Sequence, residues 1–489
     1  MHTKTLRLNA RHAVLAGLCA VLAGCATVVV VPVEEEVKLG NEAARQVEQQ
    51  IGIYQSDHTT DFIKAIGNRL VENLDDRQYN FSFQIVDQGE PNAFALPGGH
   101  IYISRGLLAL ANNEDEIAGI LGHEIIHVTR RHSMRQTQKS VLPGLLTLPG
   151  RIVGRVVNTE LGNLVNAPIE SVGQVFLAQY SRGQESEADS LGIRLAARSG
   201  YDPKALSAIL ARLEKNVKML TGKEQKFSFF DSHPTTPSRV KDLNRESAGI
   251  QWSRQASFAS EKKDFLNRLN GIFVTIDPAN GTFHGRQFLQ PTMNISITFP
   301  DGWETVNTPT AAGAVQKDKK ALVFLGVAGK SDDPEKQAKA FIEQLRQEFK
   351  ASPSGSRPVT IGAWPGYAVT YTDDSGREPM HLHFLWVEAD HLTFRLIGVG
   401  SDKYRDILKQ TALSLRPLTA KERESITGVR LRIAVAKPSE TVTELGHRTG
   451  NFWSPAYAAM MNGIMKEKKL EAGELIKIAR EEAYRPASK

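Results

Sequence analysis

The chain has 489 residues, of which 41% are apolar and 23% are charged. Enough apolar surface is present to build ordinary cores, which excludes an intrinsically disordered protein, and the length suggests about three domains. The formal net charge of +6 falls to +3 because three basic residues, Lys4, Arg7 and Arg11, lie in an N-terminal segment that we expect to be removed. With so small a charge and no basic stripe that contains aromatic residues, we expect no nucleic-acid partner.

Residues 1–24 have the form of a secretory signal peptide, with a basic start and the short apolar stretch AVLAGLCAVLAG at 13–24. That stretch is too short for an anchoring transmembrane helix. It ends in LAGC at 22–25, which resembles the bacterial lipobox, whose cysteine is acylated. We therefore expect lipidation of Cys25; the alternative is an ordinary signal peptide in which Cys25 is incidental.

Residues 25–37 are expected to form a lipidated tether that holds the protein to a membrane in the periplasm. By resemblance to lipoprotein sorting in enterobacteria, Ala26 after the cysteine favours the outer membrane. Cys19 leaves with the signal and Cys25 carries lipid, so no cysteine remains for a disulfide and stability must come from core packing.

Residues 38–250 are predicted to form a mainly helical domain with a small sheet that includes an edge strand. Helical spacing at the start gives way to a predicted strand pair, FSFQIV at 81–86 and HIYIS at 100–104, and long helical patterns then continue to about residue 245. The whole chain is thus expected to be a multidomain α+β protein.

Residues 285–420 are predicted to form a small antiparallel α+β domain of unknown role. Its predicted strands are 295–299, 321–329, 366–371, 381–388 and 391–398, with an amphipathic helix at 334–349. His381 and His383 share one face of their predicted strand. We expect them to be sheet-surface histidines rather than a second metal site.

Residues 428–480 are predicted to follow the order strand, helix, helix, strand. This βααβ order, with Asn462-Gly463 before the sequence LEAGE at 470–474, resembles a degenerate LysM module. The resemblance implies contact with peptidoglycan, and a purely structural tail is the alternative.

The strongest chemical signal is the segment NNEDEIAGILGHEIIHVTRRH at 112–132, in which Asn113 and Glu116 predict a capping box. Its apolar residues recur at helical spacing, so we expect a buried amphipathic helix. His123 and His127 are four residues apart and therefore point the same way, as two zinc ligands require, while Glu124 can reach a water beside them.

A third ligand can be sought by the class of zinc site. A metzincin needs glycine and histidine at positions where this chain has Arg130 and Ser133. His132 misses the required position by one, and five residues past His127 it would point about 140° away on a helix, so the metzincin class fails.

A gluzincin instead takes a glutamate from a second helix. Glu185 and Asp189 are four apart on one predicted face, so Glu185 would complete the ligand set and Asp189 would accept the second N–H of a histidine ligand. Glu187 lies about 200° round that helix from Glu185, so both cannot serve.

Four ordered motifs resemble the HtpX and CAAX-prenyl-endopeptidase family of zinc metallopeptidases. They are HExxH at 123–127, ExxxD at 185–189, NAFALPGGHIYISRGLL at 92–108 and HPTTPSR at 233–239. The resemblance covers about residues 38–250 and is closest to the exported lipoprotein branch. It implies one Zn²⁺ per chain on His123, His127 and Glu185, with Glu124 as the general base and Asp189 behind the ligands.

The same resemblance gives roles to residues outside the zinc ligands. The stretch Asn92, Ala93, Phe94 and Ala95 would lie in an edge strand that pairs with an extended substrate. His233 would approach the metal as a plug that keeps the enzyme latent, or would stabilise the transition state; a plain loop residue is the alternative. Arg239 would orient the substrate or cap its loop, and the sequence does not decide between them.

These observations predict a membrane-tethered periplasmic zinc endopeptidase that acts on unfolded or unassembled envelope proteins, a substrate class that comes from the resemblance alone. A chaperone-like outer-membrane assembly factor with a latent or structural zinc site is the main alternative. A scaffold anchored to peptidoglycan is the third. An intact Glu124 argues against both alternatives, because a structural site needs no base.

Overall fold

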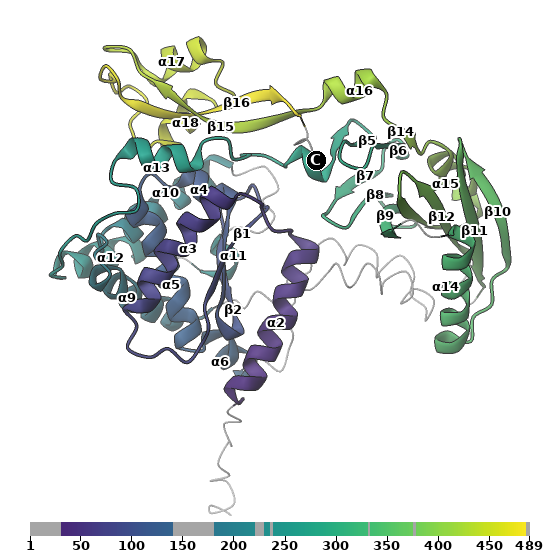
Figure 1. The fold of residues 1–489 in the computed structure, drawn as a ribbon, viewed down its shortest axis with the longest axis horizontal. Coiled ribbons are helices and arrows are strands. Elements are labelled where there is room, and N and C mark those ends of the chain that lie inside the picture. Colours follow the sequence, from purple (N-terminus) through teal and green to yellow (C-terminus); the bar gives the residue numbers. More distant parts are fainter. Residues whose placement is uncertain are drawn as a thin grey trace, which may run out of the picture.

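The computed structural model describes residues 31–139, 180–220, 229–234, 238–330, 333–374 and 378–485. The predicted signal peptide, Cys25 and Ala26 lie outside the described residues. Figure 1 shows a helical part, a second part rich in strands beside it, and a small C-terminal module that lies on the helical part. No helix among the described residues combines the length and the hydrophobicity needed to cross a membrane.

The helical part contains a small three-stranded sheet of β1 (Ser82–Val86), β2 (Ala93–Leu96) and β3 (His100–Ser104). The strand order is β1-β3-β2, with β1 parallel and β2 antiparallel to β3. The two predicted strands therefore pair, and β2 lies at an edge of the sheet. Gly98 and Gly99, between β2 and β3, have φ of 81° and 103°, left-handed values that favour glycine.

Ten helices are described in this part of the chain. They are α2 (Val33–Gln50), α3 (Asp57–Glu72), α4 (Arg105–Leu110), α5 (Glu114–Thr129), α6 (His132–Lys139), α9 (Arg182–Arg198), α10 (Ala205–Leu220), α11 (Phe229–Ser232), α12 (Arg239–Ala248) and α13 (Lys262–Leu269). Phe265, Leu266 and Leu269 of α13 belong to the same core as α5, so the helical part extends beyond the predicted end at residue 250.

The start of α2 differs from the sequence prediction. Residues 33–37, expected in the tether, form the first turns of α2 instead. Acidic residues in this first turn favour the N-terminus of a helix because they complement its dipole. The carboxylate of Glu36 is buried and accepts hydrogen bonds from Tyr79 Oη at 3.1 Å and Arg131 Nε at 2.7 Å. These contacts join the helix to the body of the domain.

Helices α5 and α9 approach closely because each has a glycine at the contact. A Cβ atom on Gly192 would lie 3.0 Å from the backbone nitrogen of His123, and one on Gly122 would lie 3.1 Å from the carbonyl oxygen of Gly192. At the start of α5, Asn113 Oδ1 accepts from the backbone N–H of Glu116 at 2.9 Å. The Glu116 carboxylate accepts from Asn112 N rather than from Asn113 N, so only half of the predicted capping box forms.

The second part is built on two antiparallel sheets. The larger has the order β10 (Gly355–Ile361), β11 (Trp364–Asp373), β12 (Met380–Ala389), β13 (Leu392–Gly400), β9 (Leu322–Lys330), β8 (Ala311–Val315), β7 (Glu304–Asn307). The smaller has the order β14 (Arg416–Pro417), β6 (Ile295–Thr298), β5 (Gln287–Gln290), β4 (Thr282–His284). An α+β domain with antiparallel strands was the prediction for this region.

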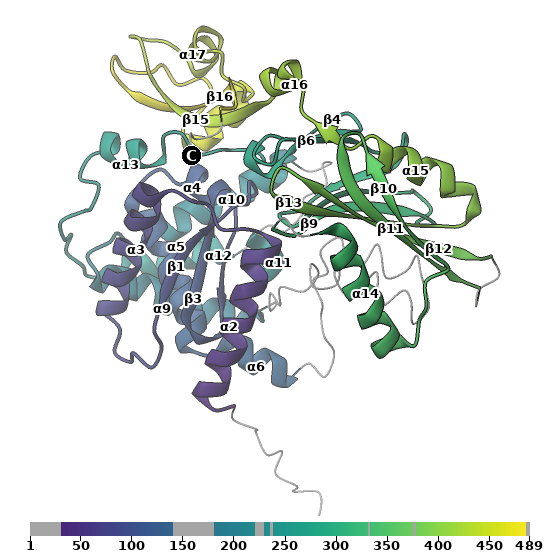
Figure 2. The same cartoon turned by 45° about the vertical axis from the view of Figure 1, so that its right-hand side comes forward.

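Helices α14 (Pro334–Phe349) and α15 (Arg405–Leu413) pack against opposite faces of the larger sheet (Figure 2). Under α14, Phe341 contacts Phe384 and Trp386, with ring centroids 4.8 and 5.3 Å apart. The other face packs against α15 and the smaller sheet. A short helix, α16 (Ala420–Ser425), leads from there to the C-terminal module.

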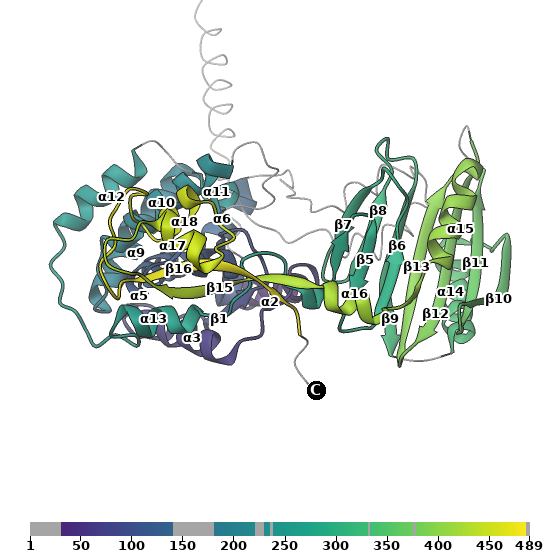
Figure 3. The same ribbon diagram turned by 90° about the horizontal axis from the view of Figure 1, so that it is seen from above.

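The C-terminal module, residues 427–483, consists of β15 (Thr427–Val435), α17 (Val442–Thr449), α18 (Pro455–Met461) and β16 (Leu475–Ala483), with the two strands antiparallel. The element order is the predicted one, while the LysM assignment stays a prediction. Figure 3 shows the module lying over the helical part. Leu431, Met460 and Met461 of the module belong to the hydrophobic core that contains α5.

A buried lysine joins this module to the helical part. Lys477 Nζ donates to the carbonyl oxygens of Ala109 and Ala111, both at 2.7 Å, and of Leu110 at 3.3 Å, at the end of α4. Burial holds the pKa of Lys477 well below its usual range. The three carbonyl oxygens are shielded from water, so Lys477 supplies the hydrogen bonds that water cannot.

Replacing Lys477 with methionine should lower the free energy of unfolding by about 1–3 kcal/mol, because the buried carbonyl oxygens lose their donor. Urea denaturation of the full chain measures the change. Lys466→Met, which alters an exposed lysine of the same module, is the matched control and should change stability little. Equal stability of the two variants would contradict the importance of this contact.

Candidate metal centre

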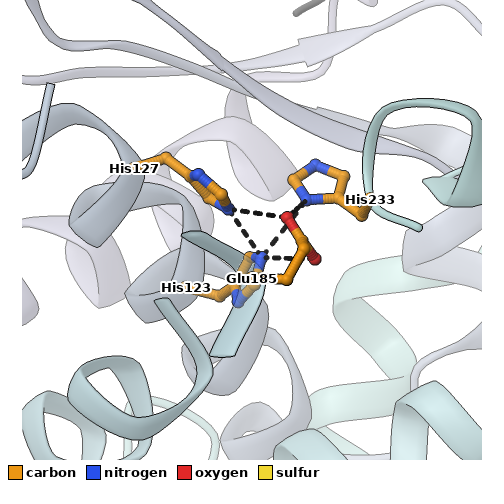
Figure 4. A group of neighbouring side chains, drawn as sticks. All are labelled: His123, His127, Glu185 and His233. Atoms are coloured by element: carbon orange, nitrogen blue, oxygen red, sulfur yellow. Dashed lines mark hydrogen bonds and ion pairs between the residues drawn. The ribbon is translucent and has the colours of Figure 1, made fainter. Parts of the chain in front are cut away.

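Four side chains from three places in the chain converge inside the helical part (Figure 4). His123 and His127 come from α5, Glu185 from the first turn of α9, and His233 directly follows α11. One ligand atom of each lies within 4.8 Å of the others, and all four residues are buried. The Nε2 atoms of His123 and His127 are 2.9 Å apart, and His233 Nδ1 lies 3.0 Å from Glu185 Oε1.

The other ring nitrogens of the α5 histidines have protein partners. His123 Nδ1 lies 2.9 Å from Asp189 Oδ1, close to the carboxylate that the spacing of Glu185 and Asp189 indicated, and His127 Nδ1 lies 2.9 Å from His132 Nδ1. Both rings therefore present Nε2 to the centre of the cluster. Imidazole nitrogens and a carboxylate are the donors that zinc takes in sites of this kind, so the residues present fit a zinc ion.

Glu124 lies next to this cluster and is fully buried. Neither of its carboxylate oxygens has a hydrogen-bond partner among the described residues, and Oε1 is 3.4 Å from His233 Nε2. Burial raises the pKa of Glu124 because it penalises the charged form. A buried carboxyl group without a partner, beside a metal-binding cluster, is placed to exchange protons with a reactant.

Arg239, at the start of α12, holds the two carboxylates of α9. Its Nε and Nη2 atoms donate to Asp189 at 2.7 and 2.8 Å, and its Nη1 atom is 2.8 Å from Glu185 Oε2. The side chain is 6% exposed, and these two carboxylates occupy its guanidinium group. It fixes the metal-binding carboxylate and the carboxylate behind it as one unit.

For Glu185 and His233, neighbouring charges shift the pKa more strongly than burial does. Burial alone would raise the pKa of Glu185, but His233 and His127 hold it well below its usual range. Burial alone would lower the pKa of His233, but Glu185 and Glu124 raise it. For His127 burial dominates and lowers the pKa, which favours the neutral imidazole that a metal needs.

His132 and Glu187 lie beside the metal-binding cluster without being among its members. His132 is fully buried, and its Nε2 atom lies 3.3 Å from Glu187 Oε2 while its Nδ1 atom faces His127. The predicted helix through residue 132 does not form, because α5 ends at Thr129 and Arg131 takes a left-handed φ of 55°. This turn brings His132 back against His127.

Two aromatic side chains that the sequence did not single out pack on the site. Tyr180 stacks on His127, with ring centroids 3.7 Å apart, and its hydroxyl lies 3.1 Å from Ser133 Oγ. Phe229 stacks on His233 at 4.3 Å. Neither lies in a motif, although Phe229 stands four residues before His233, the spacing of one helical turn.

The predicted substrate strand corresponds to β2, with Asn92 directly before it. Ala93, Phe94 and Ala95 are buried, and the backbone N–H of Asn92 donates to Ser104 Oγ at 2.8 Å. The backbone N–H of Phe229 donates to the carbonyl oxygen of Pro91 at 3.3 Å. The segment that carries His233 is therefore attached to the chain just before the edge strand.

Replacing His132 with phenylalanine should weaken zinc binding about 10–100-fold, because His127 loses the acceptor that holds its Nδ1 proton and its ring orientation. His132→Asn, whose side-chain oxygen can accept from His127 Nδ1, should restore most of the affinity. Competition with a chromogenic chelator measures this without reference to activity. Equal affinity of the phenylalanine variant and the wild type would show that His132 only fills space.

Comparison with known proteins covers this same part of the chain. Residues 57–247 match the model of Peptidase family M48. The chain is 29% identical over 214 residues to the beta-barrel assembly-enhancing protease of Yersinia pestis, covering 43% of each chain. It is 24% identical over 245 residues to mitochondrial metalloendopeptidase OMA1 of Schizosaccharomyces pombe, covering 48% of this chain and 66% of that one. The chain spans less than half the length of the beta-barrel assembly-enhancing proteases that it matches.

The matched residues contain every member of the metal-binding cluster, together with Glu124, Asp189 and Arg239. The match confirms the resemblance to the HtpX and CAAX-prenyl-endopeptidase family of zinc metallopeptidases that the motifs indicated. The sequence motifs, the zinc-type donor atoms of the cluster and the matched relatives all point to this family. Residues 57–247 of this chain therefore form a domain of Peptidase family M48.

Proposed function

We propose that this protein is a zinc endopeptidase, tethered to a membrane in the periplasm through lipid on Cys25, that hydrolyses peptide bonds of unfolded or unassembled envelope proteins. The observation that carries the proposal is the buried, unpartnered Glu124 beside a cluster of three histidines and Glu185. A purely structural metal site has no use for such a group.

The residues of the site divide the work of hydrolysis. When held by His123, His127 and Glu185, zinc supplies a Lewis acid that polarises the scissile carbonyl group. Glu124 takes a proton from the attacking water, a step that its raised pKa favours because it makes the carboxylate a stronger base, and then delivers the proton to the leaving amine. Asp189 and His132 keep the two histidine rings turned toward the metal.

His233 supports a latent form of the enzyme. Its Nδ1 atom lies 3.2 Å from His123 Nε2 and 3.0 Å from Glu185 Oε1, so the ring takes the place of a fourth ligand. Its Nε2 atom faces Glu124, and the ring thus stands between the ligands and the base. Substrate and water would need this place, so His233 must leave before a peptide is cleaved.

The substrate class rests on relatives and on the N-terminal sequence. Matched relatives from Yersinia pestis and Escherichia coli are named beta-barrel assembly-enhancing proteases. The lipobox-like sequence LAGC at 22–25 favours a location in the periplasm. The edge strand β2 offers an extended peptide a partner for strand addition. We propose peptidoglycan contact for the C-terminal module on the βααβ order alone.

A second candidate is a chaperone-like assembly factor in which the site stays closed. It is favoured by the full burial of His123, Glu124 and His233. Zinc content and casein cleavage of the full chain distinguish the candidates. Zinc near one ion per chain with cleavage supports the peptidase, while zinc without cleavage in the wild type and in His233→Ala supports the assembly factor. Absence of zinc would contradict both.

His233→Ala should raise peptidase activity several-fold and weaken zinc binding, because the variant opens the position beside Glu124 but removes one nitrogen donor. Casein cleavage at saturating zinc and chelator competition measure the two effects. His58→Ala, which alters an exposed histidine on α3, is the matched control. Lower activity than wild type at saturating zinc would show that His233 assists the reaction instead of blocking it.

A further inference from the structure

The second part of the chain contains a large groove that the peptidase proposal does not use. It lies between α15 and the β10–β12 end of the larger sheet, on the face opposite α14, and has a volume of about 1030 Å³. Binding sites for small molecules typically measure about 300–1,000 Å³. We call this feature the α15 groove.

The strand register explains why the sheet is open here. One row of paired residues on the groove face runs Gly355, Thr370, His383, Gly398 across β10 to β13. Gly355 leaves open space at the β10 end of the row, while Leu408 of α15 packs over Gly398 at the β13 end. The next row runs Arg357, Ala368, Leu385, Leu396, so an apolar floor lies directly beside the polar one.

The polar row carries an imidazole nitrogen that has no protein partner. His383 Nδ1 lies 3.2 Å from Thr370 Oγ1, but His383 Nε2 is buried and has no hydrogen-bond partner among the described residues. Burial, with His381 and Arg405 nearby, lowers the pKa of His383 to about 4, so the ring is neutral at neutral pH. Nδ1 is thus engaged with Thr370, and Nε2 remains for a hydrogen bond to a ligand.

The neighbouring His381 has a polar side chain near each of its ring nitrogens. Its Nδ1 atom lies 3.2 Å from Thr372 Oγ1 and its Nε2 atom 2.9 Å from Asp402 Oδ1. His381 is 8% exposed, so the expectation that both histidines lie on the sheet surface is wrong for it. The ring centroids are 6.1 Å apart, and His381 Nε2 lies within ion-pair distance of Asp402, whereas His383 Nε2 has neither an ion pair nor a hydrogen bond among the described residues.

Charges along the groove favour an anion. Three cations, Arg357, Arg405 and Lys409, line the groove with one acidic residue, Asp406, and Arg405 also pairs with Asp402. The apolar side is lined by leucines, among them Leu408 and Leu413, and Leu413 is 49% exposed. A guest with an apolar chain and an anionic head would cover this exposed leucine and face the cations at the same time.

An extended peptide fits this end of the sheet less well. Strand β10 is the edge strand, so a peptide would have to pair with it. Pro358 lies in the middle of β10 and lacks the N–H that an added strand would need. The groove therefore favours a small amphiphile over strand addition.

We infer that the α15 groove binds an anionic acyl amphiphile, with its chain on Leu385, Leu396, Leu408 and Leu413 and its head group at Arg405, Lys409 and His383 Nε2. A free fatty acid and a lysophospholipid share this chemistry. The inference does not depend on the peptidase site, which lies in a different part of the chain.

Calorimetric titration of the full chain with dodecanoate, below its critical micelle concentration, tests the inference. One dodecanoate should bind per chain, and affinity should fall at least tenfold in Arg405→Ala/Lys409→Ala and in His383→Phe, which keeps a ring of similar size. Arg405 and Lys409 are exposed, so the double variant should fold, and its thermal unfolding midpoint checks this. Lysophosphatidylglycerol is titrated in parallel to distinguish the two sources of the acyl chain.

The matched control is Lys339→Ala/Arg346→Ala, which removes two exposed cations from α14 on the opposite face of the sheet and should bind dodecanoate as the wild type does. Tight binding of lysophosphatidylglycerol alone, lost in the groove variants, would support the inference with a phospholipid as the source. Three results would overturn it: no saturable binding of either probe, equal losses in groove and control variants, or equally tight binding of dodecyltrimethylammonium.

Discussion

Replacing Glu124 with glutamine should leave zinc bound at one ion per chain and lower the rate of peptide cleavage by about 10²–10⁴-fold. Glutamine has nearly the same shape but cannot take a proton from water. Glu124 is not among the metal-binding cluster, so the metal should be retained. Elemental analysis gives the zinc content, and cleavage of casein by the wild type and the variant gives the loss.

The same substitution in the His233→Ala background is the sharper form of this test, because there the position beside the base is open. Glu72→Gln, which alters an exposed glutamate of α3, is the matched control and should leave activity unchanged. If Glu124→Gln kept zinc and cleaved casein like the wild type, Glu124 could not be the general base.

Replacing Arg239 with methionine should lower the free energy of unfolding of the metal-free protein by about 3–5 kcal/mol. Methionine fills much of the same space but leaves the buried carboxylates of Glu185 and Asp189 without their shared cation, and removing one partner of a buried ion pair is strongly destabilising. Urea denaturation at pH 7 with a chelator present measures the loss. Zinc should restore part of it, because the ion supplies positive charge to Glu185.

Arg254→Met provides the comparison that isolates burial. Arg254 also pairs with an aspartate, Asp115, at 3.0 Å, but its side chain is 51% exposed. Exposed pairs contribute about 0–1 kcal/mol, so this variant should be almost as stable as the wild type. Similar small losses in both variants would mean that Arg239 does not hold the site together.

The sequence predicted best where local signals were complete. The helix at 334–349 has the predicted bounds, because Asp333 caps it, Pro334 occupies its first turn and Lys350 ends it in a left-handed conformation. Strand β10 was missed because its side chains are mostly exposed and show no apolar alternation. Strands β4, β5, β7, β8 and β14, all of them short, were also missed, whereas the short strand β6 was predicted from its alternation.

At the metal site, the sequence predicted the residues that follow from regular spacing along a helix. It placed His123, His127, Glu185 and Asp189 on two helices, and the structure brings these residues together. It failed for His132, because a single left-handed residue, Arg131, redirects the chain and no residue type announces that turn. Tyr180 and the buried role of Arg239 depend on packing between distant segments, which spacing along one helix does not contain.

The Lys477 contact and the module side chains in the core have a consequence for biosynthesis. Leu431, Met460, Met461 and Lys477 are translated after the whole of the second part, yet they complete the domain whose cluster spans residues 123–233. A nascent chain that has passed residue 247 has all its zinc ligands but an unfinished core. Completion of this core is thus tied to the last stretch of synthesis, and an isolated fragment of residues 57–247 would expose apolar surface that the module covers in the full chain.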